Sequence, residues 1–206
     1  MSFKSNLVLL PDRFVLKCTH GCGFNIFCED KSSLDKAETG RLLDRWLKID
    51  YSGKYGEIHY SGIRPLIICE PFLLDSIRSL PLDYKIHCFN GKAYFTTVCS
   101  ERQLDGGGTK YDHYDLAWEN LLPFSKSGLR LERRVPAPAA YPEMLEAAEI
   151  LSKPFPYVRV DFYCINDKAV LGEMTFTPAG CVDTGYTEEA QMLLGEMIIL
   201  PERFPK

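Results

Sequence analysis

Runs of apolar residues near the start of the chain predict two strands joined by a tight turn. Residues 14–18 are apolar except for Lys17, and residues 24–28 resume the strand pattern. The intervening segment, residues 19–23, contains two glycines, as is typical of a turn. We therefore expect the chain to open with a hairpin-like pair of strands.

A helix and a further strand are predicted next. The spacing of apolar residues predicts a helix over 33–48, with Ser33 as its N-cap. The apolar run at 65–69 predicts a buried strand. Glu70 and Pro71 follow this run, and we expect the strand to end there because a proline restricts the residue before it.

The second half of the chain mixes hairpins with helices. Asn90-Gly91 is a strong two-residue turn signal between strands predicted at 84–89 and 92–98. A helix is predicted over 142–152, where a proline near the start suits the first helical turn. This mixture indicates an α+β fold rather than a doubly wound parallel sheet.

Two segments of this half are predicted to be irregular. Residues 101–112 are polar and include Gly106–Gly108, which predicts a mobile surface loop. A mobile glycine-rich loop at this place would suit a lid. Residues 123–142 hold four prolines, which predicts a long crossing connection. A last helix is expected to start near Thr187.

The composition is that of an ordinary globular protein with one domain, or one domain split into two lobes. The chain has 206 residues, of which 46% are hydrophobic and 25% charged. The formal net charge of −4 argues against nucleic-acid binding, which draws its affinity from excess positive charge. No apolar stretch is long enough for a signal-peptide core or a membrane span. The eight cysteines form no CxxC pair, so we expect reduced, mostly buried thiols in a cytoplasmic protein.

The most informative chemistry lies in two strands predicted at 157–164 and 169–176. Alternation gives each strand one face that carries its charged groups; the members are Arg159, Asp161 and Tyr163 in the first strand, and Leu171, Glu173 and Thr175 in the second. A three-residue turn at 166–168 would place Asp161 opposite Glu173 and Arg159 opposite Thr175. A two-residue turn would shift these pairings only to a diagonal.

Two carboxylates that face each other across a sheet repel, at a cost of a few tenths to about 1 kcal/mol. A bound cation would reverse the sign of this interaction. Magnesium commonly takes one or two protein carboxylates and completes its shell with phosphate oxygens and water. Arg159 could then stabilise charge on a transferring phosphoryl group. The alternative is a solvated face on which Arg159 forms an ion pair with Glu173.

Three other residues are candidate nucleotide contacts. Lys17 is costly in an apolar run unless it faces a cleft or an anion, and the amides of the glycine turn after it could approach phosphates. Glu70, before Pro71, could read an adenine or ribose edge from an extended hinge. Lys85 shares a strand face with Asp83 and His87 and is a possible second phosphate contact. The alternatives are a lysine that extends to solvent, a surface glutamate and the polar face of a hairpin.

Taken together, the sequence resembles the TupA-like family of the ATP-grasp superfamily, which is named after a teichuronopeptide-biosynthesis protein. The similarity runs in one order from about Phe14 to Pro201. The segments that carry it are 14–26, 67–73, 83–92, 111–118, RVDFY at 159–163 and GEMTFTPAG at 172–180.

The resemblance implies an ATP-grasp fold of two α+β lobes, with mainly antiparallel sheets, that clamp ATP. The smaller lobe, residues 1–75, would hold the phosphate loop and the hinge strand, and residues 76–206 would hold the metal site. The implied roles are phosphate binding by Lys17 and Lys85, loop closure around Gly21 and Gly23, a hinge contact by Glu70, Mg²⁺ binding by Asp161 and Glu173, and stabilisation of the phosphoryl group by Arg159. Thr175 occupies the position where many members of the superfamily have an asparagine near the metal, and the family's own Glu-x-Thr-Phe pattern accommodates it.

The activity implied by the resemblance is an ATP- and Mg²⁺-dependent ligase that joins a carboxylate to an amine or a similar nucleophile through an acyl phosphate. The expected setting is the decoration of cell-surface polysaccharide, for example by an amide on a uronic acid. Two alternatives are an ATP-dependent phosphotransferase and a non-catalytic nucleotide-binding module that needs a partner. The resemblance leads us to expect a sizeable segment upstream of the Lys17 strand, which the given sequence does not include. The sequence would then be a fragment, a naturally short form or one half of a complex. We expect that segment to help form the acceptor site.

Overall fold

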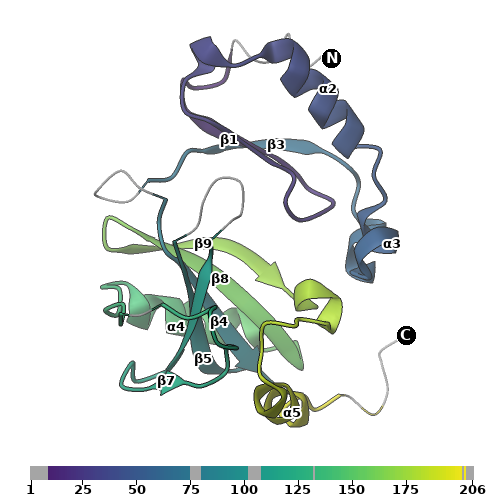
Figure 1. Cartoon of the computed structure of the whole chain (residues 1–206). Helices are drawn as coiled ribbons and strands as arrows, with labels where there is room; N and C mark the ends of the chain where they lie inside the picture. Colours follow the sequence, from purple (N-terminus) through teal and green to yellow (C-terminus); the bar gives the residue numbers. More distant parts are fainter. Residues whose placement is uncertain (1–8, 75–79, 102–107, 132, 201, 203–206) are drawn as a thin grey trace. The chain divides into compact units, whose positions relative to one another are not determined.

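The computed structural model of the chain describes residues 9–74, 80–101, 108–131, 133–200 and 202. The chain divides into two compact units, Met1–Leu73 and Leu74–Lys206, each of which contains its own sheet (Figure 1). Which ligands each unit binds stays a prediction. No helix among the described residues is both long and apolar enough to cross a membrane.

The first unit is built on a three-stranded antiparallel sheet with the order β2-β1-β3. Strands β1 (Phe14–Cys18) and β2 (Asn25–Cys28) flank the turn as predicted, and Lys17 pairs with Asn25. Helical segments connect β2 to β3 (Ile67–Pro71); they are η2 (Lys31–Ser33), α2 (Lys36–Trp46), α3 (Tyr51–Tyr55) and η3 (Ile58–Gly62). The core lies between α2 and one face of the sheet and includes Phe14, Leu16 and Leu43.

Helix α2 begins later than the apolar spacing predicted. Its N-cap is Asp35, whose carboxylate accepts hydrogen bonds from the amides of Ala37 and Glu38, both at 2.9 Å. Ser33 lies instead in the short 3-10 turn η2, so its prediction as the cap was wrong. Asp35 prevails because its side chain satisfies two of the amides that a helix leaves unpaired at its start.

Strand β3 differs from the prediction in both its end and its burial. Glu70 and Pro71 do not stop the strand, because they pair with Val15 and Phe14 of β1. The strand is also not buried, since Ile68 and Cys69 are exposed. Both corrections have one cause. β3 is an edge strand, and an edge strand tolerates a proline because one of its sides needs no amide donor.

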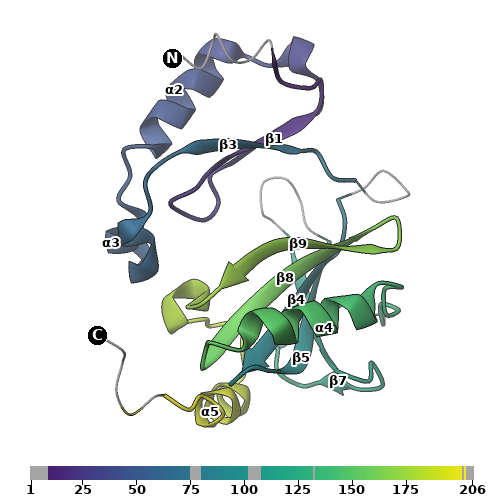
Figure 2. The ribbon, with the colours of Figure 1, turned by 180° about the vertical axis from the view of Figure 1, so that it is seen from behind.

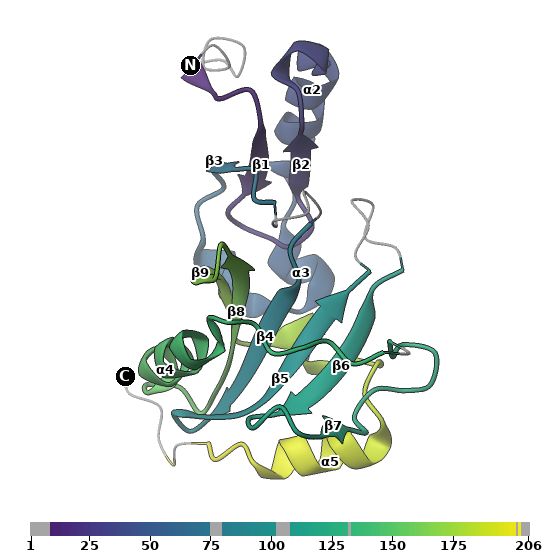
Figure 3. The ribbon, with the colours of Figure 1, turned by 90° about the vertical axis from the view of Figure 1, so that its left-hand side faces the viewer.

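The second unit is built on a six-stranded antiparallel sheet with the order β7-β6-β5-β4-β8-β9 (Figure 3). Its strands are β4 (Asp83–Phe89), β5 (Lys92–Ser100), β6 (Lys110–Asp115), β7 (Leu121–Leu122), β8 (Tyr157–Ile165) and β9 (Lys168–Thr175). The β4–β5 hairpin turns at Asn90-Gly91 as predicted, with φ values of 50° and 79° that match the left-handed conformation of such turns.

Two helices cover opposite faces of this sheet. Helix α4 (Tyr141–Ser152) packs Met144 and Ala148 against Ile86, Val158 and Val160 (Figure 2). On the other face, α5 (Glu188–Glu196) packs Ala190 against an aromatic cluster that includes Phe89, Phe95 and Phe124. The side chain of Thr187 caps α5, in agreement with the predicted start. The short η4 (Pro178–Cys181) lies between β9 and α5.

The β8–β9 hairpin reaches the predicted pairing by a different route. Asp161 faces Glu173 and Arg159 faces Thr175, as predicted. The turn has two residues, not three, because Ile165 already pairs with Lys168. A bulge at Gly172 adds the missing residue and restores the register beyond it. The bulge also pairs Leu171 with Phe162, so the prediction that Leu171 shares the face of Glu173 was wrong.

The predicted loop over 101–112 is shorter at its end, because β6 already begins at Lys110. Of its glycines, Gly106 and Gly107 lie outside the described residues, so the predicted lid stays a prediction. All eight cysteines are free thiols; four of them are buried, so the prediction of mostly buried thiols held for only half.

Candidate active site

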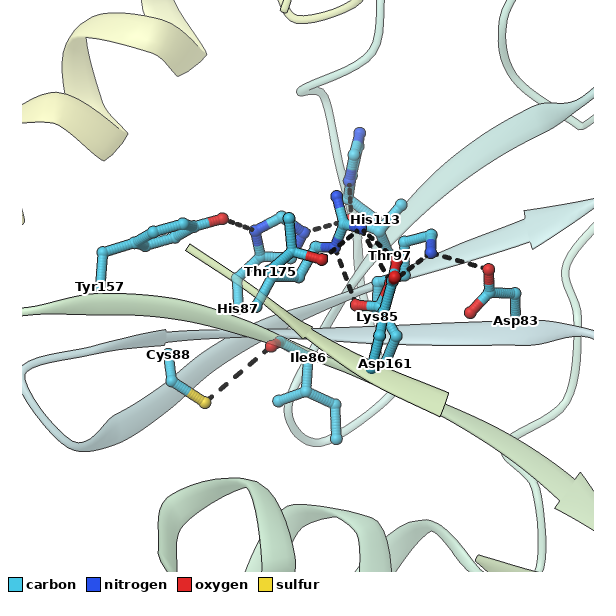
Figure 4. A network of polar contacts seen from close by, with 12 residues as sticks. Asp83, Lys85, Ile86, His87, Cys88, Thr97, His113, Tyr157, Asp161 and Thr175 are labelled. Atoms are coloured by element: carbon cyan, nitrogen blue, oxygen red, sulfur yellow. Dashed lines mark hydrogen bonds and ion pairs between the residues drawn. The ribbon is translucent and has the colours of Figure 1, made fainter. Parts of the chain in front are cut away.

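A row of polar side chains crosses the sheet of the second unit, one from each of five neighbouring strands. The pairing register aligns Glu173 of β9, Asp161 of β8, Lys85 of β4, Thr97 of β5 and His113 of β6. Residues that are opposite each other in a sheet project from the same face. The apolar residues Ile86 and Cys88 project from the other face (Figure 4). The strand order thus gathers residues from distant parts of the sequence.

Asp161 is the centre of this row. Its carboxylate accepts two hydrogen bonds from Arg159, both at 2.8 Å, and a third from the Lys85 ammonium at 2.5 Å. The residue is only 2% exposed. Burial alone would raise the pKa of Asp161, but the charges of Arg159 and Lys85 outweigh burial and lower it. Asp161 is therefore a buried carboxylate that stays ionised.

Lys85 lies between two carboxylates. Its ammonium is 2.7 Å from Asp83 Oδ2 on the same strand and 2.5 Å from Asp161 Oδ2 on β8. Burial would lower the pKa of Lys85, yet these two carboxylates raise it above its ordinary value. Arg159 is held in a similar way, and its pKa is also raised, chiefly by Asp161 against the effect of burial. Both cations are fixed and charged.

Glu173 and Thr175 complete the edge of the site on β9. Glu173 Oε1 lies 3.6 Å from the Arg159 guanidinium, and the Thr175 hydroxyl accepts a hydrogen bond from it at 3.1 Å. The loose ion pair of Arg159 with Glu173 thus coexists with its tight pairing to Asp161. Burial and the neighbouring Asp161 raise the pKa of Glu173. This carboxylate is more exposed than Asp161, with 53% of its side chain accessible.

The donor set fits a magnesium ion. Two opposed carboxylates, Asp161 and Glu173, are the kind and number of protein ligand that this ion takes beside a nucleotide. Burial is the largest cause of the raised pKa of Glu173, and repulsion by Asp161, which a cation would relieve, adds to it. Among the described residues no group of three or more acidic, histidine or cysteine side chains could form a metal cage. Thr175, which accepts a hydrogen bond from Arg159, lies two residues along β9 from Glu173.

A series of hydrogen bonds between uncharged side chains continues from the site across the sheet. It links Tyr157, His87, Thr97, His113 and Ser125 through contacts of 2.7–3.0 Å (Figure 4). Ser125 donates its only proton to the carbonyl of Tyr111, so it must accept from His113. Thr97 then donates to Nδ1 of His113 and accepts from Nε2 of His87, whose Nδ1 accepts from the Tyr157 hydroxyl. Both histidines are therefore neutral, each with its proton on Nε2. Burial lowers the pKa of both, that of His113 to about 3.

The first unit brings together two other predicted contacts. Lys17 Nζ and Glu70 Oε2 form an ion pair at 2.5 Å, with about a third of each side chain or more exposed. Gly23 is exposed and has φ of 78°, so the turn after Lys17 needs a glycine there. Gly21 is needed for packing, since a Cβ atom at this position would lie 2.6 Å from the Tyr51 ring.

Sequence reasoning assigned no role to Asp83, Thr97, His113 or Tyr157. Alternation placed Asp83 on the strand face of Lys85, but it did not show that the two side chains form an ion pair. Thr97 and His113 could not be found from alternation, because they join the row only through the order of β6, β5 and β4.

The class that this fold defines is the α+β ATP-grasp fold, with mainly antiparallel sheets in two units. The sequence profile of the TupA-like ATPgrasp family matches residues 4–199, which is nearly the whole chain. The chain therefore belongs to the TupA-like ATPgrasp family. A comparison with curated proteins returns no match.

Solved structures similar to this one include D-alanine–D-alanine ligases. The enzyme from Bacillus anthracis in complex with ATP has 13% identity and a TM-score of 0.46, covering 90% of this chain and 49% of that one. Another structure of the Bacillus anthracis enzyme has 12% identity and a TM-score of 0.41, covering 96% and 56%. The Helicobacter pylori enzyme has 13% identity and a TM-score of 0.41, covering 98% and 54%. The chain thus spans about half the length of these proteins, and such distant likeness carries no argument about activity.

Proposed function

We propose that this protein is an ATP- and Mg²⁺-dependent ligase that joins a carboxylate to an amine, or to a similar nucleophile, through an acyl phosphate. The observation that carries the proposal is the group formed by the buried side chains of Arg159, Lys85 and Asp161 on one face of the sheet, with the more exposed Glu173 beside them. Fixed cations beside opposed carboxylates suit a phosphoryl group with its metal. Membership of the family supports the same reading.

Each residue has a proposed role in this reaction. Arg159 and Lys85 orient and neutralise the transferring phosphoryl group, because both are donors whose charge is maintained by neighbouring carboxylates against the effect of burial. Asp161 and Glu173, with Thr175 as a further candidate ligand, would hold Mg²⁺. This ion, when bound, supplies charge neutralisation of the nucleotide phosphates.

The first unit contributes nucleotide contacts in this proposal. Lys17 binds phosphate oxygens once its ammonium leaves Glu70, and Glu70 is then available to accept from a ribose or adenine group. The exposed amides near Gly23 bind phosphate, while Gly21 keeps the turn packed on Tyr51.

For the biological setting we propose decoration of a cell-surface polysaccharide, with a uronic acid or other carboxylate as acceptor and an amine as donor. We place the reaction in the cytoplasm, where ATP is available. Eight free thiols are consistent with a reducing compartment.

Thermal unfolding with and without Mg²⁺-ATP tests the nucleotide site. Ligand at about 100 times its dissociation constant adds roughly 2.7 kcal/mol to the free energy of unfolding. For a chain of this size, that raises the midpoint of thermal unfolding by about 5–10 °C. Asp161→Asn should abolish the Mg²⁺-dependent part of the shift. Asp112→Asn is the matched control, because Asp112 is an equally buried carboxylate outside the polar row. An unchanged shift in Asp161→Asn would contradict the proposed metal site.

The reaction class is tested by the products formed with candidate carboxylates. The proposed route releases ADP, and hydroxylamine should trap the acyl phosphate as a hydroxamate. A phosphorylated product that is stable to hydroxylamine would instead indicate a phosphotransferase. Release of AMP without ADP would contradict the acyl-phosphate route. Tight binding of ATP without turnover of any candidate would favour a nucleotide-binding module.

A further inference from the structure

The ammonium of Lys85 has two carboxylate partners that differ in their other contacts. Asp161 Oδ2 lies 2.5 Å away and Asp83 Oδ2 lies 2.7 Å away. Only 15% of the Lys85 side chain is exposed, with 9% for Asp83 and 3% for Asp161. A charge this deeply buried needs a partner of opposite sign at all times.

Asp161 does not depend on Lys85 for its charge balance. Arg159 donates to both of its oxygens at 2.8 Å, so the carboxylate keeps a cationic partner when Lys85 leaves. A divalent cation held by Asp161 and Glu173 would repel the ammonium of Lys85, because like charges in a buried site are weakly screened. The ammonium must then withdraw from Asp161.

We propose that Asp83 is a positioning residue that retains Lys85 when Asp161 takes up the metal ion, an inference that rests on the proposed function. Lys85 needs no large movement for this exchange, since its ammonium already touches both carboxylates. Asp83 keeps the lysine charged, buried and beside the strand from which it can reach a phosphate. Asp83 acts through Lys85 and does not itself contact the nucleotide.

Calorimetric titration with ATP, in the presence and in the absence of Mg²⁺, tests this role. The measured quantity is the Mg²⁺ gain, defined as the dissociation constant without Mg²⁺ divided by that with Mg²⁺. In Asp83→Asn the gain should fall by about tenfold or more, because metal binding would leave a buried ammonium without a carboxylate. Binding without Mg²⁺ should stay the same or tighten, because one negative charge near the phosphates is removed.

Asp112→Asn is the matched control, since Asp112 is a buried carboxylate of the same sheet that accepts from the Leu131 amide at 3.0 Å. It should keep the full gain. Asp83→Glu, which preserves the charge, should restore most of the gain. An equal loss in Asp83→Asn and Asp112→Asn would overturn the inference, because it would indicate a general effect on the sheet.

A double mutant separates positioning from folding. In a Lys85→Met background there is no ammonium to retain, so Asp83→Asn should leave the Mg²⁺ gain unchanged. A further loss in that background would overturn the inference. If the wild type and Asp83→Asn show the same Mg²⁺ gain, the role of Asp83 is overturned and the proposed function is not. A wild-type chain that binds no nucleotide under either condition would overturn the proposed function as well.

Discussion

At the residue scale, the charged groups of the two units differ in how strongly their surroundings fix them. The pair of Lys17 and Glu70 is one-third exposed or more, so solvent screens it and the pair adds little to stability. Lys85 and Asp161 are almost fully buried and cannot separate without a replacement partner. The first pair therefore opens easily, whereas the second opens only where each of its members keeps another partner of opposite charge.

The two buried histidines give the protein a distinct acid sensitivity. Burial lowers the folded-state pKa of His113 to about 3, with a further contribution from Arg130, and also lowers that of His87. The unfolded chain titrates near 6.5, so it binds more protons than the folded protein below that pH. The two histidines therefore do not reduce the free energy of unfolding above about pH 6.5, and they reduce it increasingly as the pH drops toward 3.

Urea denaturation at about pH 7 and about pH 5.5 measures this effect. Each histidine should lower the free energy of unfolding by about 1 kcal/mol between the two values. His113→Gln removes one titrating group, so the difference between the two pH values should shrink by about half. His59→Gln, a change outside the hydrogen-bonded chain, should leave the difference as in the wild type. A pH difference that is the same in all three proteins would contradict the neutral, buried state of His113.

At the scale of elements, the β8–β9 hairpin shows what local sequence determines. Alternation predicted the face of Asp161, and the pairing with Glu173 is confirmed. The turn has two residues rather than the three first supposed, and the bulge at Gly172 makes up for the missing residue. A glycine within a strand signals a bulge, but alternation alone does not show which residue is skipped. The bulge therefore explains why the pairing of Glu173 with Asp161 was predicted correctly and the sheet face of Leu171 was not.

Gly172 is expected to determine how Glu173 is presented. A Cβ atom at this position would lie 3.2 Å from the Asp161 carbonyl oxygen and 3.3 Å from the Tyr163 ring. Gly172→Ala should therefore push the two strands apart, destabilise the unit by about 1 kcal/mol and weaken Mg²⁺-dependent ATP binding. Denaturation and ATP titration measure the two effects.

Gly195→Ala provides the control for this change. Gly195 lies in α5 with no atom near its Cβ position, so alanine should add about 0.5–1 kcal/mol of stability through helix propensity. ATP binding should not change. If Gly172→Ala behaved in the same way, the bulge would have no part in placing Glu173.

At the scale of the whole molecule, the order of strands in the sheets is the feature that local sequence signals do not predict. The α+β class, the β4–β5 hairpin and the start of α5 follow from local signals. The row from Glu173 to His113 depends on β4 lying between β5 and β8, although more than sixty residues separate β4 from β8 in the sequence. The burial of β3 was mispredicted for the same reason, because an edge strand and a central strand can share one apolar pattern.

The proposed function draws on residues of both units, and hydrogen exchange can test this directly. Saturating Mg²⁺-ATP should slow amide exchange in peptides that cover 17–23 and 67–71 of the first unit, because ligand contacts suppress local opening. Peptides that cover 83–88 and 159–175 of the second unit should be slowed as well. Helix α4 packs on the opposite face of the sheet and should show little change, which provides an internal control.

The same measurement on Asp161→Asn separates the contributions. Loss of the proposed metal ligand should remove the protection that depends on Mg²⁺ at 159–175. Part of the protection at 17–23 should remain, because the proposed contact of Lys17 with phosphate does not involve the metal. Protection confined to the second unit in the wild type would contradict the roles of Lys17 and Glu70. Uniform slowing along the chain, α4 included, would indicate global stabilisation, since ligand binding to the folded state alone also reduces unfolding.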